Sequence, residues 1–556
     1  MYRVPFCVVI VEVLLLSTLS LSAQPASPAT PTFKSSTELV LIPTVVSDKS
    51  GAHVPGLKKE DFVLKQDGKS HPIVIFEEVK TTPATLRRSE GEHGTFNNFE
   101  TGGGEYHRLN IIVLDFVNTP FADQANARNE LLKFLSEVAE SGEPMCLMAL
   151  TRRGLNLLHD FTDDPRLLAA ALRKARADNA PLIHESIVDA GHPPVGDGLG
   201  AMLTMLIRGQ LQSEAALAST ETKSAAFLTV QAMQQIAKAF RGLPGRKALI
   251  WASSGFPFSL TPPSEAMCDD DCPAHHGDEM QSAYDNLWRA MNDAQIAIYS
   301  VDLRSAAPMS MSSEGVRPSD IGDAQFDVDA QAQWKRQDTD STLQLFAENT
   351  GGKAFLGGGN LVQSFRQATQ DDSSYYMLGY YVDRSSTKPG WHSIRVTSRR
   401  GGHARFRNGF FVTRDPSSAS ARPDMQLALA SPIDFVGVPI SITWTGKGNG
   451  DSAAKTKMQF ELVMPASFAA VDESDQNHMV VDIAAVAKDH NGLQVAEISQ
   501  RIDTHLRADG LSQIQNSGLT YRNGISLPPG EYTVRFVVRD SLGNRMGSVA
   551  APVKVR

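Results

Sequence analysis

The chain has 556 residues, of which 42% are hydrophobic and 21% are charged. These proportions are typical of a folded globular protein, and the length predicts about three or four domains instead of a single core. The formal net charge is −9 and no long Lys/Arg block occurs. Nucleic acid is therefore a poor partner, because nucleic-acid affinity depends largely on neutralising phosphates.

Residues 1–23 have the pattern of a secretory signal peptide. Arg3 precedes an apolar stretch from Val8 to Leu21, and small residues follow at Ser22 and Ala23. The stretch is shorter than the ~20 residues that span a bilayer, which favours cleavage near Ala23 over an uncleaved membrane anchor. No later stretch is apolar enough to span, so we expect a secreted, periplasmic or envelope protein without a membrane span after signal removal.

The next segments predict a small β domain between two linkers. Residues 24–36 are rich in Pro, Ala, Ser and Thr and are expected to be a linker. Short alternating runs separated by Asp/Ser/Gly turns over residues 37–79 predict a small antiparallel β-sandwich. Residues 80–107 are charged and Gly-rich without periodicity, which predicts a second linker.

From residue 108 to 415, apolar strands alternate with amphipathic helices. This repetition predicts an α/β domain with a doubly wound, mostly parallel sheet that is covered on both faces. Residues 305–338 are expected to be an inserted loop, and β-like segments over 375–412 are expected to end the domain. Strands are expected over 111–114, 145–150, 247–252 and 296–301, and helices over 126–140, 165–177, 199–207, 227–240, 280–294, 341–349 and 361–369.

Residues 425–556 return to the alternation of β-strands. The closing run from Leu527 to Val538, followed by the turn Asp540–Asn544, is typical of a β-sandwich hairpin. An Ig-like β-sandwich is therefore expected at the C-terminus.

Cys268 and Cys272 bracket three aspartates in the α/β region. Export makes a disulfide between them the favoured interpretation. The alternative is a metal clip completed by His275 and His276, although this spacing does not usually close a tetrahedron.

The strongest functional landmark is Asp115, which follows the buried run Asn110–Leu114. Ligand sites in open α/β sheets lie at the carboxyl ends of the strands. An acidic residue with nearby hydroxyls at this position suggests a cation site through which the protein binds a partner.

The middle region resembles a von Willebrand factor type A domain, and more closely its secreted acidobacterial variant. The resemblance covers roughly residues 37–415. It is carried by the motifs Val54–Phe62, Asp115–Thr119, Pro244–Pro257, Thr350–Ala354, Tyr375–Tyr380 and Arg407–Phe410. It implies a doubly wound fold with a metal-ion-dependent adhesion site at the strand ends.

This resemblance also implies that the adhesion site is degenerate. Such sites read Asp-x-Ser-x-Ser and add a Thr and a later Asp. Asp115 and Thr119 match, whereas Val117 and Ser254 replace a Ser and the Asp. A hard divalent ion needs about six oxygen donors. The loss of one Ser and one Asp ligand therefore favours a site without Mg²⁺ or Ca²⁺ over one with a metal.

Asn118 offers an amide oxygen, which makes Asp115, Asn118 and Thr119 the candidate metal ligands. Asp197 is a candidate to compensate for the acid lost at Ser254, and Thr204, Thr222 and Thr229 are the candidates for the second-loop Thr. The structural alternative is that Asp115 holds its loop by hydrogen bonds to backbone N–H groups. The predicted binding surface comprises Asp115, Asn118, Thr119, Asp197, Ser253 and Ser254.

We therefore expect an exported, non-enzymatic adhesion or interaction module that binds an unidentified protein partner and requires no cofactor. The sequence indicates neither that partner nor the oligomeric state.

The alternative is an envelope enzyme or a carbohydrate-binding protein in which the α/β domain is only a scaffold. Ser186, Asp189 and His192 include triad residue types without a nucleophile elbow. The tyrosines at 375, 376, 380 and 381 are candidates for sugar binding, but at strand spacing they favour packing.

Overall fold

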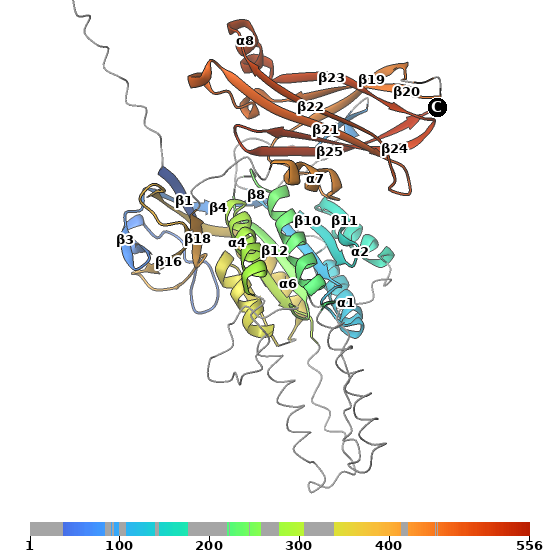
Figure 1. Ribbon diagram of the computed structural model, residues 1–556. Coiled ribbons are helices and arrows are strands. Elements are labelled where there is room, and N and C mark those ends of the chain that lie inside the picture. Colours follow the sequence, from blue (N-terminus) through green and yellow to red (C-terminus); the bar gives the residue numbers. More distant parts are fainter. Residues whose placement is uncertain are drawn as a thin grey trace, which may run out of the picture.

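The computed structural model has a mixed α/β architecture with several sheets (Figure 1). The N-terminal segments expected to be signal peptide and linker lie outside the residues that it describes. None of the described helices is long and apolar enough to cross a membrane. The described residues are 37–83, 90–91, 94–98, 107–138, 144–175, 220–256 without 222 and 244, 277–304, 339–412 without 358, and 421–556 without 451 and 453.

A six-stranded sheet forms the central body. Its strands are β9 (Asn110–Asp115), β10 (Met145–Thr151), β11 (Gly154–Thr162), β12 (Lys247–Ser253), β13 (Ile296–Asp302) and β14 (Lys353–Phe355). They are arranged in the order β11-β10-β9-β12-β13-β14. Only β11 runs antiparallel, as the partner of β10 in a hairpin, and the other described pairs are parallel. The sheet is therefore mixed but mostly parallel.

Helices cover both faces of this sheet because successive residues of its strands point to opposite sides. Ile112 and Leu114 of β9 pack under α1 (Phe121–Glu137), α2 (Pro165–Lys174) and α6 (Leu361–Gln370). Ile111 and Val113 pack under α4 (Gly277–Asp293) and the helices over residues 223–239 and 339–350. This arrangement explains why the strands are continuous apolar runs.

Most expected strands and helices of the central body are present, with shifted ends. The helix predicted over 126–140 begins at Phe121, directly after Pro120, which stands at its N-cap position. Asp164 caps α2 by accepting a hydrogen bond from the Arg166 backbone N–H at 3.0 Å. The helix expected over 199–207 and the inserted loop 305–338 lie outside the described residues.

Two four-stranded sheets form an N-terminal β body. Segments far apart in the sequence build both sheets, which have the orders β17-β1-β15-β4 and β18-β16-β2-β3. Residues of both sheets, including Ile42 and Tyr376, share one hydrophobic core. The strands are β1 (Thr37–Ser47), β2 (Phe62–Gln66), β3 (Lys69–His71), β4 (Ile75–Lys80), β15 (Ser374–Asp383), β16 (Gly390–Ser398), β17 (His403–Arg405) and β18 (Gly409–Val412).

The boundary expected after residue 79 is therefore wrong as the end of a self-contained domain. β1 pairs antiparallel with β15, from Thr37 opposite Asp383 to Thr44 opposite Tyr376. The segment 375–412 was expected to end the α/β domain, but its strands belong to the N-terminal β body instead. Local sequence patterns do not predict pairing between strands that lie so far apart in the sequence.

The tyrosine cluster lies mostly inside the protein. Tyr375, Tyr376 and Tyr380 are buried in β15, whereas Tyr381 is 57% exposed. The Tyr376 hydroxyl donates to the Val54 carbonyl at 2.8 Å and accepts from the Leu57 N–H at 3.1 Å. The packing interpretation accounts for the three buried tyrosines.

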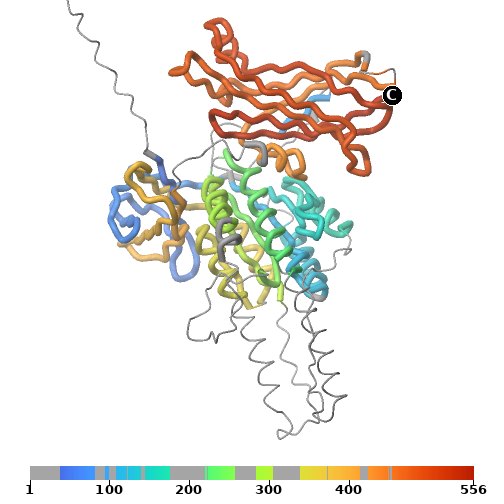
Figure 2. The backbone as a smooth tube through the Cα atoms, in the orientation of Figure 1, coloured from blue at the N-terminus to red at the C-terminus, as the bar shows by residue number. Residues whose placement is uncertain are grey.

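A C-terminal β body contains a five-stranded and a four-stranded sheet around one core. Their orders are β23-β20-β19-β7-β6 and β22-β21-β24-β25, and α7 (Ala421–Ala430) packs between this body and the central one (Figures 1 and 2). The strands are β6 (Glu90–Gly91), β7 (Thr95–Asn97), β19 (Ser441–Asn449), β20 (Thr456–Met464), β21 (His478–Lys488), β22 (Gln494–His505), β23 (Leu519–Leu527), β24 (Gly530–Asp540) and β25 (Arg545–Val555), and α8 spans Ala508–Ser517.

The segment 80–107 is more than the linker that its composition predicted. β7 pairs with β19, placing Phe96 opposite Ile442 in the C-terminal body. Two further short strands, β5 (Thr82–Pro83) and β8 (His107–Arg108), pair with each other in parallel. The short, polar strands in this segment lack the apolar alternation that would have identified them.

Candidate functional site

Asp115 ends β9, next to β12 on one side and β10 on the other. Its backbone lies opposite Leu150 of β10, and Phe116 extends the contact by donating its N–H to the Leu150 carbonyl at 3.0 Å. The sheet therefore holds this carboxylate at the carboxyl edge of its central strands. The side chain is fully buried, with 0% exposure.

Five donors surround the two oxygens of the Asp115 carboxylate. The backbone N–H groups of Val117 and Asn118 donate to Oδ1 at 3.1 and 3.0 Å. Oδ2 lies within hydrogen-bond distance of Asn118 Nδ2 at 2.7 Å, Trp251 Nε1 at 3.1 Å and the Ser253 hydroxyl at 3.1 Å. This geometry is that of an anion held by its own loop and by the adjacent strand.

Three hydroxyl groups extend the network to neighbouring elements. Thr119 Oγ1 accepts from the Ser254 N–H at 3.1 Å, and the Ser254 hydroxyl donates to Asp123 of α1 at 3.0 Å. Asn118 Nδ2 also donates to Thr229 Oγ1 at 2.8 Å. Of the three threonines considered for the second loop, Thr229 lies at this site, while Thr204 and Thr222 are outside the described residues.

Burial raises the pKa of Asp115 to about 6, because desolvation of the carboxylate outweighs the hydrogen bonds from Asn118, Trp251 and Ser253. The group is therefore mostly ionised at neutral pH and accepts a proton about two pH units higher than an exposed aspartate does. Its charge is kept inside the protein at a cost in stability.

The described side chains do not fit a divalent ion at Asp115. Both carboxylate oxygens face N–H or O–H donors, which a cation would have to displace. Val117 packs its apolar side chain into the core. Asn118 Oδ1 is a buried acceptor without a hydrogen bond, but one oxygen falls far short of the roughly six that a hard ion takes.

The predicted binding residues that the structure describes are interior and do not form a contact surface. Asp115, Thr119 and Ser253 are each 0% exposed, Asn118 is 3% exposed and Ser254 is 9% exposed. The expectation that these side chains touch a partner is therefore corrected: they hold loops. Asp197, Cys268, Cys272, His275 and His276 lie outside the described residues, as do Ser186, Asp189 and His192.

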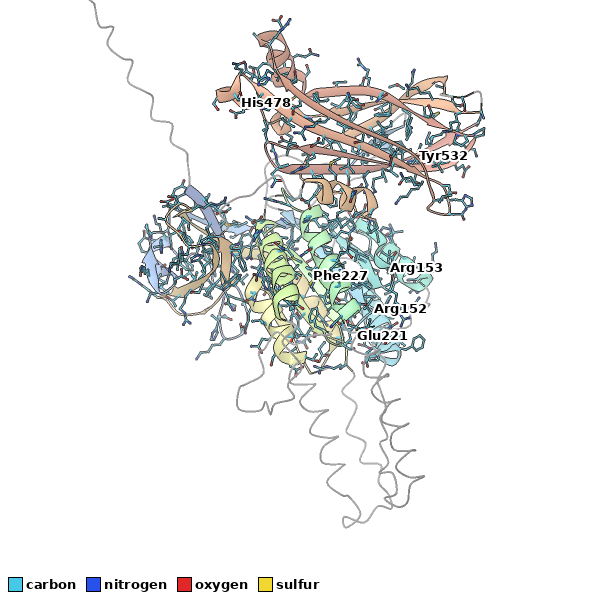
Figure 3. All side chains as sticks on the ribbon, in the orientation of Figure 1. Arg152, Arg153, Glu221, Phe227, His478 and Tyr532 are labelled. Carbon is cyan, nitrogen blue, oxygen red and sulfur yellow. The ribbon has the colours of Figure 1, made fainter. Side chains whose placement is uncertain are left out.

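Exposed side chains lie at the same carboxyl edge of the central sheet as the Asp115 loop. Phe121, the first residue of α1, is 58% exposed, only six positions after Asp115. Arg152 and Arg153 are exposed in the turn between β10 and β11, on the central body (Figure 3). Sequence reasoning missed these residues, because only the strand register shows that the β10–β11 turn and the Asp115 loop share an edge.

The loop that precedes Phe121 is firmly tied to α1. Gln124 Nε2 donates to the carbonyls of Phe116 at 3.1 Å and Thr119 at 2.8 Å. The Gln124 backbone N–H donates to the Pro120 carbonyl at 3.0 Å. Together with the hydrogen bonds to Asp115, these bonds hold the loop that carries the exposed Phe121 in one conformation.

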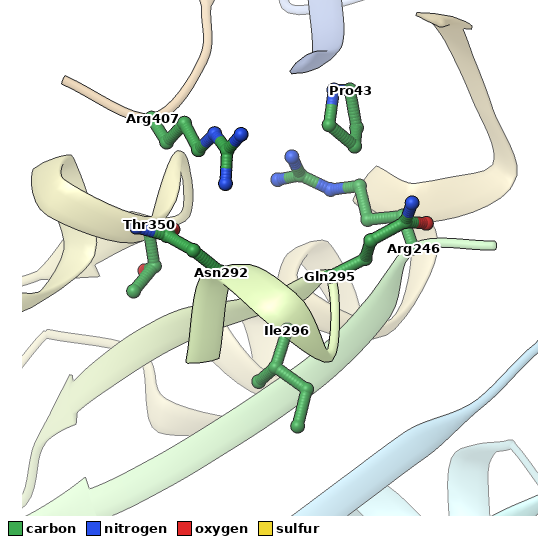
Figure 4. A pocket seen from close by; sticks show the side chains of 7 residues that line it. All are labelled: Pro43, Arg246, Asn292, Gln295, Ile296, Thr350 and Arg407. Carbon is green, nitrogen blue, oxygen red and sulfur yellow. The ribbon is translucent and has the colours of Figure 1, made fainter. Parts of the chain in front are cut away.

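A second candidate site is a small cavity between the N-terminal and central bodies. Figure 4 shows the guanidinium groups of Arg246 and Arg407 pointing into it, and Pro43, Asn292, Gln295, Ile296 and Thr350 complete its lining. Burial lowers the pKa of Arg407 to about 10. The cavity has room for roughly one water molecule and not for an organic substrate.

No model of a known protein family matches this chain, and no curated protein sequence matches it.

Proposed function

We propose that this chain is an exported, non-enzymatic interaction protein. In this proposal the central body is a doubly wound, von Willebrand A-like domain between two β-sandwiches. The strand order supports it: numbered along the domain, the strands stand in the order 3-2-1-4-5-6, with helices on both faces. Open sheets of this order bind ligands at the carboxyl edge, where the strand order reverses.

The observation that carries the proposal is the exposed Phe121 on a rigid base at that edge. It lies beside the point of reversal between β9 and β12, and buried hydrogen bonds fix the loop before it. Large exposed aromatic side chains are enriched at the centres of protein interfaces. Arginine is also enriched there, and Arg152 and Arg153 supply positive charge at the same edge.

We further propose that binding does not need Mg²⁺ or Ca²⁺. The Asp115 carboxylate is surrounded by five protein donors, so the loop is ordered without an ion. A loop that is already ordered loses little conformational entropy on binding.

The experiment that tests the function is capture from the envelope fraction of the source organism with the immobilised full chain. Phe121→Ser should weaken capture of the specific partner about tenfold, as expected for an aromatic anchor worth more than 1 kcal/mol. The matched control is Leu167→Ser. Leu167 is 48% exposed at the start of α2, which follows the antiparallel β11 and therefore begins at the opposite edge of the sheet.

Equal loss of capture in both variants would show nonspecific hydrophobic adsorption and would contradict the proposal. Unchanged capture by Phe121→Ser would also contradict it, provided that the variant has the thermal unfolding temperature of the wild type.

A further inference from the structure

A cluster of two histidines and an aspartate lies at one end of the C-terminal body. His478 begins β21 and His505 ends β22, and the two residues are direct cross-strand partners. Their imidazole rings stack with centroids 4.7 Å apart and an interplanar angle of 14°. Figure 3 places His478 at the end of this body, far from the labelled residues of the central body.

The backbone brings Asp475 back to the two histidines. Asp475 ends the short helix η6 (Glu473–Asp475), and the next two residues, Gln476 and Asn477, have φ angles of 51° and 60°. These left-handed conformations reverse the chain. Asp472 and His478 close the turn by backbone hydrogen bonds of 2.8 and 3.1 Å. These backbone hydrogen bonds hold the turn closed.

The two separations between Asp475 and the histidines are close to those between ligands of one ion. Asp475 Oδ2 lies 3.3 Å from His478 Nδ1, and Asp475 Oδ1 lies 3.6 Å from His505 Nε2. One ligand atom from each residue lies within 4.8 Å of the others. A separation of 3.6 Å is too long for a hydrogen bond. Two ligands of a tetrahedral zinc ion, with bonds of about 2.0–2.1 Å, are about 3.4 Å apart.

A second carboxylate orients the His478 ring. His478 Nε2 is 2.8 Å from Asp503 Oδ1, and Asp503 Oδ2 is held in turn by Arg501 at 3.3 Å. Metal-binding histidines commonly donate their other ring N–H to a carboxylate in this way, which fixes the tautomer and the ring orientation. With Nε2 engaged, Nδ1 is the nitrogen that faces Asp475.

We propose that Asp475, His478 and His505 bind a divalent transition-metal ion of the zinc class. Two imidazoles and one carboxylate suit Zn²⁺, whereas Mg²⁺ and Ca²⁺ prefer oxygen ligands. The side chains of Asp475 and His505 are 58% and 52% exposed, which leaves the fourth position open to water. The ion would join the start of β21, the end of β22 and the η6 turn.

The test is calorimetric titration of the full-length, metal-stripped chain with ZnCl₂. The wild type should bind one more equivalent than His478→Ala and His505→Ala, or bind that equivalent at least about tenfold more tightly. Zn²⁺ should also raise the unfolding temperature of the wild type more than that of either variant, because binding to the folded state stabilises it. Asp503→Asn, which keeps all three ligands, should weaken affinity about tenfold.

His490→Ala is the matched control. His490 is exposed in the turn at the other end of the same β21–β22 hairpin, and its loss should change neither stoichiometry nor affinity. Circular dichroism of the metal-free variants checks that they fold. Identical Zn²⁺ titrations of wild type, His478→Ala and His505→Ala, or no binding by the wild type, would overturn the proposal.

Discussion

At the scale of single residues, Asp115 acts as an internal anion that organises loops. Its carboxylate joins its own loop to β12 through Trp251 and Ser253. Through Asn118, the same loop is joined to Thr229 on the helix over residues 223–239. The donors around Asp115 all come from the protein, so the carboxylate orders this loop without a bound ion.

The raised pKa of Asp115 predicts a pH dependence of stability. The folded state binds the proton with a pKa of about 6, and the unfolded state with the ordinary aspartate pKa of 3.8. The folded state therefore holds more protons between these values, and the contribution of Asp115 to stability falls as pH rises through this window. From pH 7 to pH 5, this group should raise the free energy of unfolding by about 1 kcal/mol.

Urea unfolding of the wild type and Asp115→Asn at both pH values measures this contribution. The variant lacks the titrating carboxyl group. Its free energy of unfolding should therefore rise by about 1 kcal/mol less than that of the wild type between pH 7 and pH 5, whatever the absolute stability of the variant. Parallel pH profiles for the two proteins would show that Asp115 keeps an ordinary pKa.

At the scale of elements, the motif Thr350-Gly-Gly fixes a helix to the sheet. A Cβ atom on Gly352 would lie 1.8 Å from the Ile298 carbonyl oxygen of β13, so only glycine allows this approach. Thr350 Oγ1 accepts from the Ile298 N–H at 2.9 Å. The motif is thus explained by close packing of Gly352 and by the hydrogen bond of Thr350.

Gly352→Ala should therefore destabilise the protein by about 3 kcal/mol or more, because backbone atoms must move. The control is Gly359→Ala, where a Cβ atom would have nothing within 4 Å and the backbone needs no positive φ. Thermal unfolding compares the two. Similar melting temperatures for both variants would mean that the contact with Ile298 relaxes easily.

Local patterns predicted the elements of the central body well, since buried strands and amphipathic helices each carry their own periodicity. The local patterns did not predict which strands pair with each other. The pairing of Thr37 with Asp383, or of Phe96 with Ile442, depends on which distant strand completes an edge. The position of Asp115 at the end of a buried strand was predicted, but its burial was missed, because burial depends on how neighbouring elements cover the loop.

At the scale of the whole molecule, the N-terminal β body and the central body are interleaved in sequence. The chain builds half of the β body, then the α/β body, and then returns with β15–β18. A fragment of residues 108–415 would leave these returning strands without β1 and β2. It should be aggregation-prone, because unpaired strand edges template association.

A fragment of residues 37–412 retains both halves of the β body and should be more soluble and monomeric. Size-exclusion chromatography with light scattering compares the two fragments. A monomeric, cooperatively folding 108–415 fragment would contradict the interleaved arrangement.

We propose that the molecule binds a protein partner through exposed residues at the carboxyl edge of its central sheet, on loops that are ordered without an ion. The most direct measurement is the Kd of the captured partner for the wild type and for Phe121→Ser, each with and without EDTA. EDTA should leave the wild-type Kd unchanged, and Phe121→Ser should raise the Kd about tenfold. Binding that EDTA abolishes, that Mg²⁺ restores and that Phe121→Ser leaves unchanged would contradict it.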